Sequence, residues 1–305
     1  MTIRLSVHRD RWWAHVTDVA TSVEGLVPVV KGNGYGFGRV RLAHAAIEIG
    51  PLLAVGTVHE LEGLPAQCTP VVLTPTLHAP DSNEVVLTVA NREHVAALAG
   101  WAGRVIVKLE SSMHRYGEGI DLVEHAQRRG LRTVGVAIHP PLAGNEEDHR
   151  DDIVSRLPDI DPSLDVWVSH LAPATYAALP RSHRYKLRSG TYLWLGDREA
   201  LHLQADVLAT RPVTAGAKVG YRLTTVDADG TLVMVGAGSA NGVTALPGDT
   251  SPFHFASTRM ALVEPPHMHT SMAFVPSGQA CPEVGDWVDL QRPLTMTAID
   301  ELLWR

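Results

Sequence analysis

The sequence has few cysteines and no long apolar run, and both features narrow the class of protein. Only two of its 305 residues are cysteine, Cys68 and Cys281. Two thiols so far apart form neither a disulfide framework nor a cysteine-type zinc site, and unpaired thiols suit a reducing cytoplasm. No run approaches about 18 apolar residues, and the N-terminus lacks the layout of a signal peptide. We therefore expect a cytoplasmic protein with no membrane partner.

Basic residues are also scarce. The chain has 26 Lys and Arg against 33 Asp and Glu, a formal net charge of −7. Binding to nucleic acid or to a membrane surface needs a basic face, so we expect neither. Hydrophobic residues make up 45% of the chain, which is too many for disorder and ordinary for a globular core.

Short apolar runs alternate with amphipathic stretches through the first two-thirds of the chain. The eight runs that we expect to be strands are 26–30, 52–57, 70–74, 85–89, 105–109, 134–138, 165–168 and 192–195. The expected helices between them include 9–23, 40–49, 91–101, 119–129 and 146–157. Continuous apolar runs are typical of parallel strands buried on both faces, and eight of them predict a (β/α)₈ barrel, a TIM-type α/β fold. The alternative is an open doubly wound sheet, although no G-x-G-x-x-G motif follows a strand.

The pattern changes near residue 205. Strand-like pieces now lie close together, and turns rich in Gly, Pro, Asp and Asn separate them; they are 224–226, 232–235, 271–275 and 287–290. Such spacing predicts a smaller all-β domain. We place the barrel domain at residues 1–205 and the β domain at residues 206–305.

Cationic and imidazole side chains lie at the carboxyl ends of the expected barrel strands, where barrel enzymes place their active sites. Lys31 follows the first run and Arg115 lies in the loop beyond the fifth. His139 and His170 follow the sixth and seventh runs, and Arg188 precedes the eighth. Unpaired cations buried at strand ends are costly, so the cluster implies an anionic ligand, most simply a phosphate plus a carboxylate.

Lys31 is the most informative of these residues. It opens a segment in which glycines alternate from Gly32 to Gly38, and small residues let the backbone approach a bulky ligand. Partial desolvation in a barrel mouth would lower the pKa of the lysine, and a neutral amine can attack an aldehyde. Tyr35 could offer its hydroxyl to a phosphate. The alternative is a solvated lysine in a glycine-rich turn.

The segment Val29-Val-Lys31-Gly-Asn-Gly-Tyr35-Gly-Phe37-Gly resembles the pyridoxal-phosphate lysine motif of alanine racemases, which are fold-type III enzymes with a barrel followed by a β domain. Glycines replace the alanines usual in that family, and Phe37 stands where histidine is frequent. The resemblance implies that Lys31 binds pyridoxal 5'-phosphate (PLP) and acts as one catalytic base. It also implies an isomerase that acts at Cα of a small amino acid.

Further matches follow in order along the chain. Arg115, within Met113-His-Arg-Tyr-Gly117, resembles the arginine that contacts the cofactor's phenolic oxygen or the substrate carboxylate. Lys108, seven residues upstream, matches a lysine that is often carbamylated. His139 matches the histidine that lies against the pyridine ring. The segment that begins at His170 resembles the family's His-x-Ala-Asn-Ser segment, which implies that His170 binds the cofactor as well.

Arg188 resembles the family's arginine that faces the pyridine nitrogen, and Gly190 and Thr191 match residues whose backbone N–H groups bind the phosphate. A guanidinium cannot readily give up a proton, so the ring nitrogen stays unprotonated. An unprotonated ring is a weaker electron sink, which favours simple proton exchange at Cα.

The resemblance weakens in the second domain. The family's second base is a tyrosine from the partner subunit's β domain, and we align Ser239 with it, which indicates a divergent member that lacks this tyrosine. A serine hydroxyl is a poor substitute for a phenol. His269 could act instead, since an imidazole titrates near neutral pH. Tyr221 could supply a phenol, although we expect it to pack within the β domain. A shared site implies a homodimer with its active sites at the interface.

Other functions stay open. The cofactor could serve a decarboxylase, lyase or transaminase reaction, or the chain could be a degenerate homologue that binds the cofactor or a protein without turnover. His267 and His269 would share one face of a strand, and His254 could join them as a metal ligand. The chain has 16 histidines, so chance pairs are common and we expect no metal.

Overall fold

The computed structural model describes residues 2–305 and divides into two compact units. The barrel unit comprises Trp13–Gly34 and Arg39–Gly196. The β unit comprises the N-terminal segment through Trp12, Tyr35–Gly38 and Asp197–Arg305. The boundary that we expected at residue 205 lies inside a long strand of the β unit, which is built from both ends of the chain.

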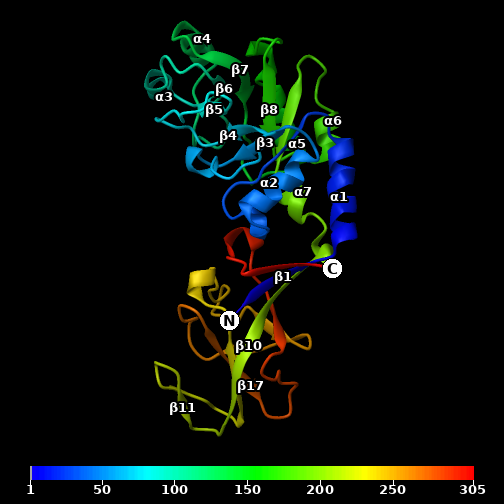
Figure 1. Ribbon diagram of the computed structural model, residues 1–305, viewed down its shortest axis with the longest axis vertical. Coiled ribbons are helices and arrows are strands. Elements are labelled where there is room, and N and C mark those ends of the chain that lie inside the picture. Colours follow the sequence, from blue (N-terminus) through cyan, green and yellow to red (C-terminus); the bar gives the residue numbers. More distant parts are fainter. Residues whose placement is uncertain (1) are drawn as a thin grey trace. The chain divides into compact units, whose positions relative to one another are not determined.

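Eight parallel strands form the sheet of the barrel unit (Figure 1). In sheet order they are β2 (Leu26–Pro28), β9 (Tyr185–Ser189), β8 (Asp165–Ser169), β7 (Arg132–Ala137), β6 (Arg104–Lys108), β5 (Val86–Val89), β4 (Thr69–Val72) and β3 (Leu52–Val55). A parallel bridge between Val29 and Ala54 joins the two ends of this order and closes the sheet. The predicted barrel is therefore confirmed.

Helices lie outside these strands (Figure 1). Over the described residues the α-helices are α1 (Arg9–Ser22), α2 (Arg39–Ile47), α3 (Arg92–Ala97), α4 (Asp121–Arg128), α5 (Glu146–Val154), α6 (Pro173–Ala177) and α7 (Thr191–Leu195). The start of α5 shows why the chain turns into a helix there. The Asn145 side chain accepts hydrogen bonds from the backbone N–H groups of Glu147 and Asp148, and Asp148 reaches back to the Asn145 N–H. This capping box satisfies N–H groups that have no partner within the helix.

The eighth barrel strand lies elsewhere than predicted. The apolar run Tyr192–Leu195 belongs to helix α7, and the last strand is β9, just upstream. β9 carries Tyr, Lys, Arg and Ser side chains around a single leucine, so it lacks the continuous apolar run that marks the other strands. The helix is apolar because it packs inward: the Trp194 indole is buried and donates to the Val29 carbonyl at 2.8 Å.

The β unit contains a nine-stranded sheet, which confirms the predicted all-β domain. Its strands are β1 (Ile3–Val7), β10 (Leu201–Val213), β13 (Gly230–Val235), β14 (Phe253–Phe255), β15 (Thr258–Arg259), β16 (Ala261–Leu262), β17 (Ser271–Pro276), β18 (Trp287–Leu290) and β19 (Glu301–Trp304). β10 pairs antiparallel with β1, β13 and β18, whereas β19 pairs parallel with β1. A separate hairpin joins β11 (Lys218–Val219) to β12 (Thr224–Thr225).

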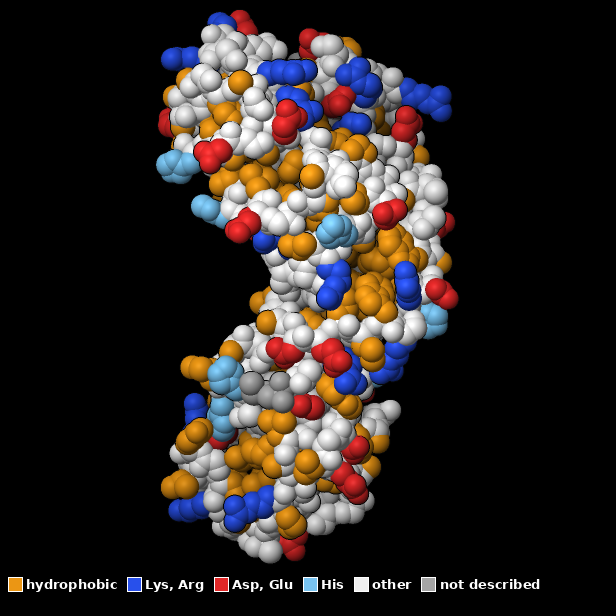
Figure 2. Space-filling model, viewed as in Figure 1, with side chains coloured by type: hydrophobic (Ala, Val, Ile, Leu, Met, Phe, Trp, Pro, Cys, Tyr) orange, Lys and Arg blue, Asp and Glu red, His pale blue; other side chains and the backbone are white. Residues whose placement is uncertain are grey.

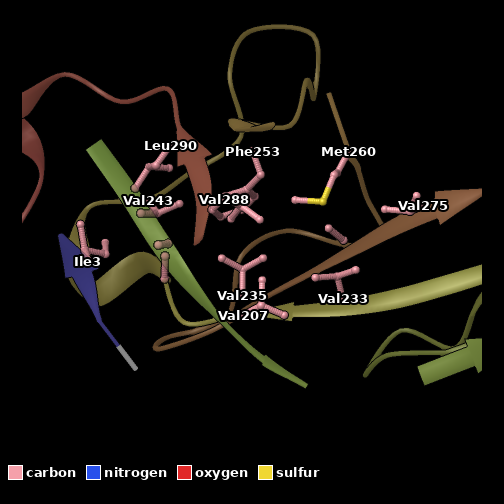
Figure 3. Close-up of a cluster of buried hydrophobic side chains, with 13 residues drawn as sticks. Ile3, Val207, Val233, Val235, Val243, Phe253, Met260, Val275, Val288 and Leu290 are labelled. Atoms are coloured by element: carbon pink, nitrogen blue, oxygen red, sulfur yellow. The ribbon is translucent and has the colours of Figure 1, made fainter. Parts of the chain in front are cut away.

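One apolar core supports the β unit (Figure 3). Its buried side chains come from segments far apart in the sequence, including Ile3, Val207, Val235, Phe253 and Val288. Burying a large apolar side chain contributes about 1.5–3 kcal/mol. This core therefore holds in place the loops that the sheet carries.

The surface carries both signs of charge. Figure 2 shows Lys and Arg interspersed with Asp and Glu on the face in view. Over residues 2–305, the helices are all too short or too polar to cross a lipid bilayer.

Candidate active site

Six cationic or imidazole side chains gather at the carboxyl-terminal ends of the barrel strands: Lys31, Lys108, Arg115, His139, His170 and Arg188. They interact electrostatically, because the charges of Arg115 and Arg188 act on both Lys31 and Lys108. Within residues 2–305, none of the four Lys and Arg side chains forms an ion pair with a carboxylate. The site is therefore strongly positive and suited to an anion.

Lys31 follows strand β2 by three residues and lies within the field of these charges. Its side chain is accessible to solvent, so a ligand can reach the amine. Partial burial lowers the pKa of Lys31, and the charges of Arg115 and Arg188 lower it further, whereas Glu60 opposes them. Glu60 is fixed by a 2.7 Å hydrogen bond from the Gly56 N–H. The lowered pKa increases the fraction of neutral, nucleophilic amine.

The backbone conformation of the segment after Lys31 explains why this segment is rich in glycine. Gly32, Gly34, Gly36 and Gly38 all have positive φ, from 63° to 91°, in the region where a Cβ is strained. Tyr35 shares this conformation with φ 55° and is 6% exposed. Burial raises the pKa of Tyr35 to about 12, so its phenol stays protonated and can donate a hydrogen bond.

Lys108 ends strand β6 and is only 4% exposed. Its ammonium lies 5.2 Å from the centre of the Tyr116 ring. Burial lowers the pKa of Lys108 to about 8, with further lowering by Arg188, Arg115 and Lys31. A pKa of about 8 leaves most of the amine charged at neutral pH, but its neutral fraction is far larger than that of an ordinary lysine.

Arg188 projects from strand β9 and is held by neighbouring strands. It donates to the carbonyls of Ile138 at 2.9 Å and Val168 at 3.3 Å, and to the Ser169 hydroxyl at 3.4 Å. Burial lowers the pKa of Arg188 to about 10, which still leaves the guanidinium charged at neutral pH. The side chain is therefore a fixed positive charge that no carboxylate within residues 2–305 neutralises.

His139 and His170 form a pair of neutral rings beside Arg188. Their ring centres are 4.5 Å apart, and His139 Nδ1 lies 2.5 Å from the Ser169 hydroxyl. Burial and the charge of Arg188 lower the pKa of His139 to about 2. The His170 Nδ1–H donates to the Pro140 carbonyl at 3.1 Å, which leaves Nε2 free.

The low pKa of His139 predicts a specific pH dependence of stability. The unfolded chain takes up a proton on this residue below about pH 6.5, whereas the folded chain does not until far lower pH. Stability is therefore full above that pH and falls as the pH decreases, by at most about 1.4 kcal/mol per pH unit. Urea unfolding at pH 7.5, 6.5 and 5.5 should show a shallower decline for His139→Asn than for the wild type. Equal slopes would contradict the assignment.

Arg115 lies in a loop that folds back on strand β6. Gly117 closes this loop with φ 105°, and an added Cβ would lie 2.4 Å from the Leu109 carbonyl oxygen. The Glu110 N–H donates to the Glu118 carbonyl at 3.0 Å. Arg115 is exposed, so its guanidinium is free to contact a ligand.

Gly190 and Thr191 lie at the start of helix α7. The Trp194 N–H donates to the Gly190 carbonyl at 2.9 Å, and the Trp194 indole ties the helix to Val29, two residues before Lys31. The first N–H groups of a helix have no partner within it and attract anions. This end of α7 is thereby fixed to the strand that carries Lys31.

Ser239 begins a short 3₁₀ helix, Ser239–Asn241, and His269 lies in a neighbouring loop; both residues belong to the β unit and are exposed. The Ser239 N–H donates to the His267 carbonyl at 2.8 Å, and the Ala240 N–H donates to the Met268 carbonyl at 2.8 Å. Residues 267–269 form a loop, so the strand on which the metal interpretation depended is absent. The part of the chain that the structure describes contains no cluster of three potential metal ligands.

Tyr221 is 86% exposed, so the prediction that it packs within the β domain is wrong. It lies in the turn between β11 and β12, where its backbone N–H donates to Glu264 at 3.1 Å. The sequence carried one signal of this exposure: Tyr221 lies between Gly220 and Arg222, a context typical of a turn and not of a buried strand.

Sequence reasoning also missed Glu60 and Ser169. Ser169 is the last residue of β8 and directly precedes His170, so the rule that placed the histidine at the strand end also applied to it. Glu60 lies in a short 3₁₀ helix, Val58–Glu60, after β3. Nothing in its local sequence indicates that it approaches Lys31.

Comparison with known proteins places the chain in a family. The model of the family "Alanine racemase, N-terminal domain" matches residues 7–195. The alanine racemase of Mycolicibacterium vanbaalenii is 29% identical over 259 residues, which cover 72% of this chain and 66% of that protein. The alanine racemase of Salinispora arenicola is 28% identical over 285 residues, which cover 79% and 75%.

Solved structures share the fold over the whole chain. Alanine racemase from Bartonella henselae, solved with covalently bound pyridoxal phosphate, has a TM-score of 0.78 at 16% identity and covers 100% of both chains. Alanine racemase from Clostridium difficile 630 has a TM-score of 0.77 at 17% identity and covers 100% of this chain and 96% of that one. The family match spans the barrel and its cluster of charged residues, and the chain belongs to the alanine racemase family.

Proposed function

We propose that this chain is a PLP-dependent isomerase that inverts Cα of a small amino acid. The observation that carries the proposal is the unpaired positive cluster around Lys31, an accessible lysine with a lowered pKa. The curated relatives are alanine racemases, and one structural neighbour holds pyridoxal phosphate covalently.

The site fits this cofactor on chemical grounds. A phosphate, a phenolic oxygen and an amino-acid carboxylate are all anionic, and they match the charges of Lys31, Arg115 and Arg188. When bound, the cofactor supplies an aldehyde that condenses with amines and a ring that withdraws electrons from Cα. The two neutral rings of His139 and His170 offer flat, uncharged surfaces beside those charges.

Each polar residue of the barrel site has a distinct task. Lys31 binds the cofactor and then moves a proton to or from one face of Cα. Arg188 would hold its own positive charge beside the ring nitrogen without giving that nitrogen a proton, so the nitrogen would stay unprotonated. Arg115 orients the substrate carboxylate or the phenolic oxygen. Gly190 and Thr191 bind the phosphate through backbone N–H groups.

Two further cofactor contacts come from the resemblance. The Tyr35 hydroxyl would donate a hydrogen bond to the phosphate, consistent with a phenol that stays protonated. His139 would lie against the pyridine ring, where its very low pKa would keep it neutral.

Inversion needs a second proton-transfer group, because Lys31 can serve only one face of a tetrahedral carbon. Tyr221 is the better candidate, since its phenol is exposed and its backbone is anchored. Ser239 and His269 lie in loops of the same unit and are the alternatives that the sequence suggested. We propose that the β unit of a second copy supplies this group, so that the active form is a homodimer.

A spectrum followed by a substrate screen tests the function. Purified protein should absorb near about 420 nm when loaded with PLP. Incubation with small amino acids in deuterated water should give both enantiomers with deuterium at Cα. Release of carbon dioxide or a keto acid would indicate a decarboxylase, lyase or transaminase instead, and bound cofactor without any turnover would indicate a degenerate homologue.

Lys108 is a buried lysine without a carboxylate partner among the described residues, which is unusual, and its chemical modification can be tested separately. We propose that its neutral amine adds carbon dioxide, losing one proton and forming a carbamate whose negative charge the neighbouring cations stabilise. Protein equilibrated with ¹³C-bicarbonate should show one carbamate resonance that is lost in Lys108→Met and kept in Lys186→Met. A spectrum identical in wild type and Lys108→Met would contradict this modification.

A further inference from the structure

A buried carboxylate in the β unit has no place in the mechanism described so far. Glu264 lies between β16 and β17, and its side chain is 2% exposed. Its two oxygens accept the Tyr221 N–H at 3.1 Å, the Arg222 N–H at 3.1 Å and the His267 Nε2–H at 2.7 Å. Burying a carboxylate is costly unless it is fully hydrogen-bonded, and these three donors meet that requirement.

The carboxylate stays ionised in this setting. Burial raises the pKa of Glu264, but the hydrogen bonds from Arg222, Tyr221 and His267 outweigh burial, and the pKa falls below its usual value. An ionised carboxylate can accept from two successive backbone N–H groups on different oxygens, which a neutral side chain cannot do equally well. The turn that carries Tyr221 is therefore built around this anion.

The turn closes tightly on the carboxylate. Gly220 has φ 74°, and an added Cβ would lie 2.4 Å from Glu264 Oε1, so only glycine fits this approach. The backbone of the turn is fixed from within, while the Tyr221 side chain faces outward.

His267 contacts the Tyr221 ring on one side. Its ring centre lies 4.7 Å from that of Tyr221, with the planes inclined at 59°. His267 is itself held by Glu264 and by a 2.8 Å hydrogen bond from its N–H to the Thr270 carbonyl. This single ring contact favours the tyrosine rotamer that keeps the two rings together.

We propose that Glu264 and His267 are positioning residues that hold the Tyr221 phenol for proton transfer at Cα. This inference rests on the proposed function, in which Tyr221 serves the face of Cα that Lys31 does not. Proton transfer requires donor and acceptor atoms within hydrogen-bond reach. If the Tyr221 side chain is no longer held in place, proton transfer slows even though the phenol itself is unchanged.

Glu264→Gln tests the role of the carboxylate. The glutamine has one accepting oxygen, and its amide NH₂ group faces a donor, so the turn loses at least one anchor. We expect kcat for racemisation to fall about 10- to 100-fold with KM little changed. Glu283→Gln, at an exposed position of the same unit, is the matched control and should retain wild-type kcat.

Isotope exchange separates positioning from a general structural role. Because the variant leaves Lys31 intact, the enantiomer that Lys31 deprotonates should still exchange its Cα hydrogen with deuterated water. The ratio of exchange to racemisation should therefore rise, and Glu264→Asp, which keeps both oxygens, should recover part of the lost inversion. His267→Phe should show the same signature, since it retains a ring but loses the hydrogen bond to Glu264.

Urea unfolding and cofactor absorbance establish that each variant is folded and loaded. If Glu264→Gln does not fold, the exchange ratio of His267→Phe decides the question. Unchanged inversion, or an equal loss of exchange and inversion, would overturn the positioning role. Absence of racemisation in the wild-type protein would overturn the proposed function, and this inference with it.

Discussion

Replacing Lys31 with alanine should give a folded protein that neither binds PLP covalently nor racemises any amino acid. In the proposed function Lys31 is both the attachment point and one of the two bases, so the variant would lose two functions at once. We expect activity to fall at least about a thousandfold, because no other side chain of the site would replace the Lys31 amine as both nucleophile and base. The band near about 420 nm should disappear as well. Chiral chromatography and absorbance spectra measure the two losses.

The small number of lysines makes this test sharp. The chain has four, Lys31, Lys108, Lys186 and Lys218, so borohydride reduction of the loaded protein followed by peptide mapping has four possible outcomes. Lys186 is the second residue of strand β9 and lies toward the strand end opposite the site. Lys186→Ala should therefore keep both absorbance and activity. Labelling of Lys108 instead of Lys31 would move the cofactor to the other lysine of the cluster and refute the assignment.

The fold was predictable for the strands whose burial on both faces gives an apolar sequence. Strands such as β5 and β8 are buried on both faces and read as continuous apolar runs. β9 breaks this rule because it carries Arg188 into the site and exposes polar side chains near its start. The apolar residues expected there occur instead in α7, which packs inward through Trp194. The functional strand was therefore the hardest one to find.

The candidate site was predictable only for side chains at strand ends. The position of Lys31, His139 or His170 after an apolar run is a local property, and the barrel geometry then brings these ends together. The exposure of Tyr221 is not local. It depends on Glu264, which lies 43 residues further along the chain and turns the tyrosine's backbone inward. Glu60 likewise acts electrostatically on Lys31, from a segment after β3 that the closure of the sheet brings beside β2.

Tyr221→Phe should remove the second base and leave the cofactor site intact. We expect racemisation to fall about 10²- to 10⁴-fold, the usual range for loss of a general acid–base group, while the cofactor absorbance is retained. Tyr185→Phe, which removes a phenol at the start of β9, is the control and should racemise at the wild-type rate. If Ser239→Ala or His269→Asn causes the loss instead, the second base is that residue.

Mixing Lys31→Ala with Tyr221→Phe should restore activity that neither variant has alone. If each site combines one chain's barrel with the other chain's β unit, a hybrid dimer contains one site with both Lys31 and Tyr221 and one site with neither. In a 1:1 mixture half of the dimers are hybrids, so about a quarter of the wild-type activity should return once subunits exchange. Recovery should require exchange and should vanish when the variants are crosslinked as homodimers before mixing. Hybrids that form but stay inactive would show that both bases come from one chain, and the interface would then have no part in the chemistry.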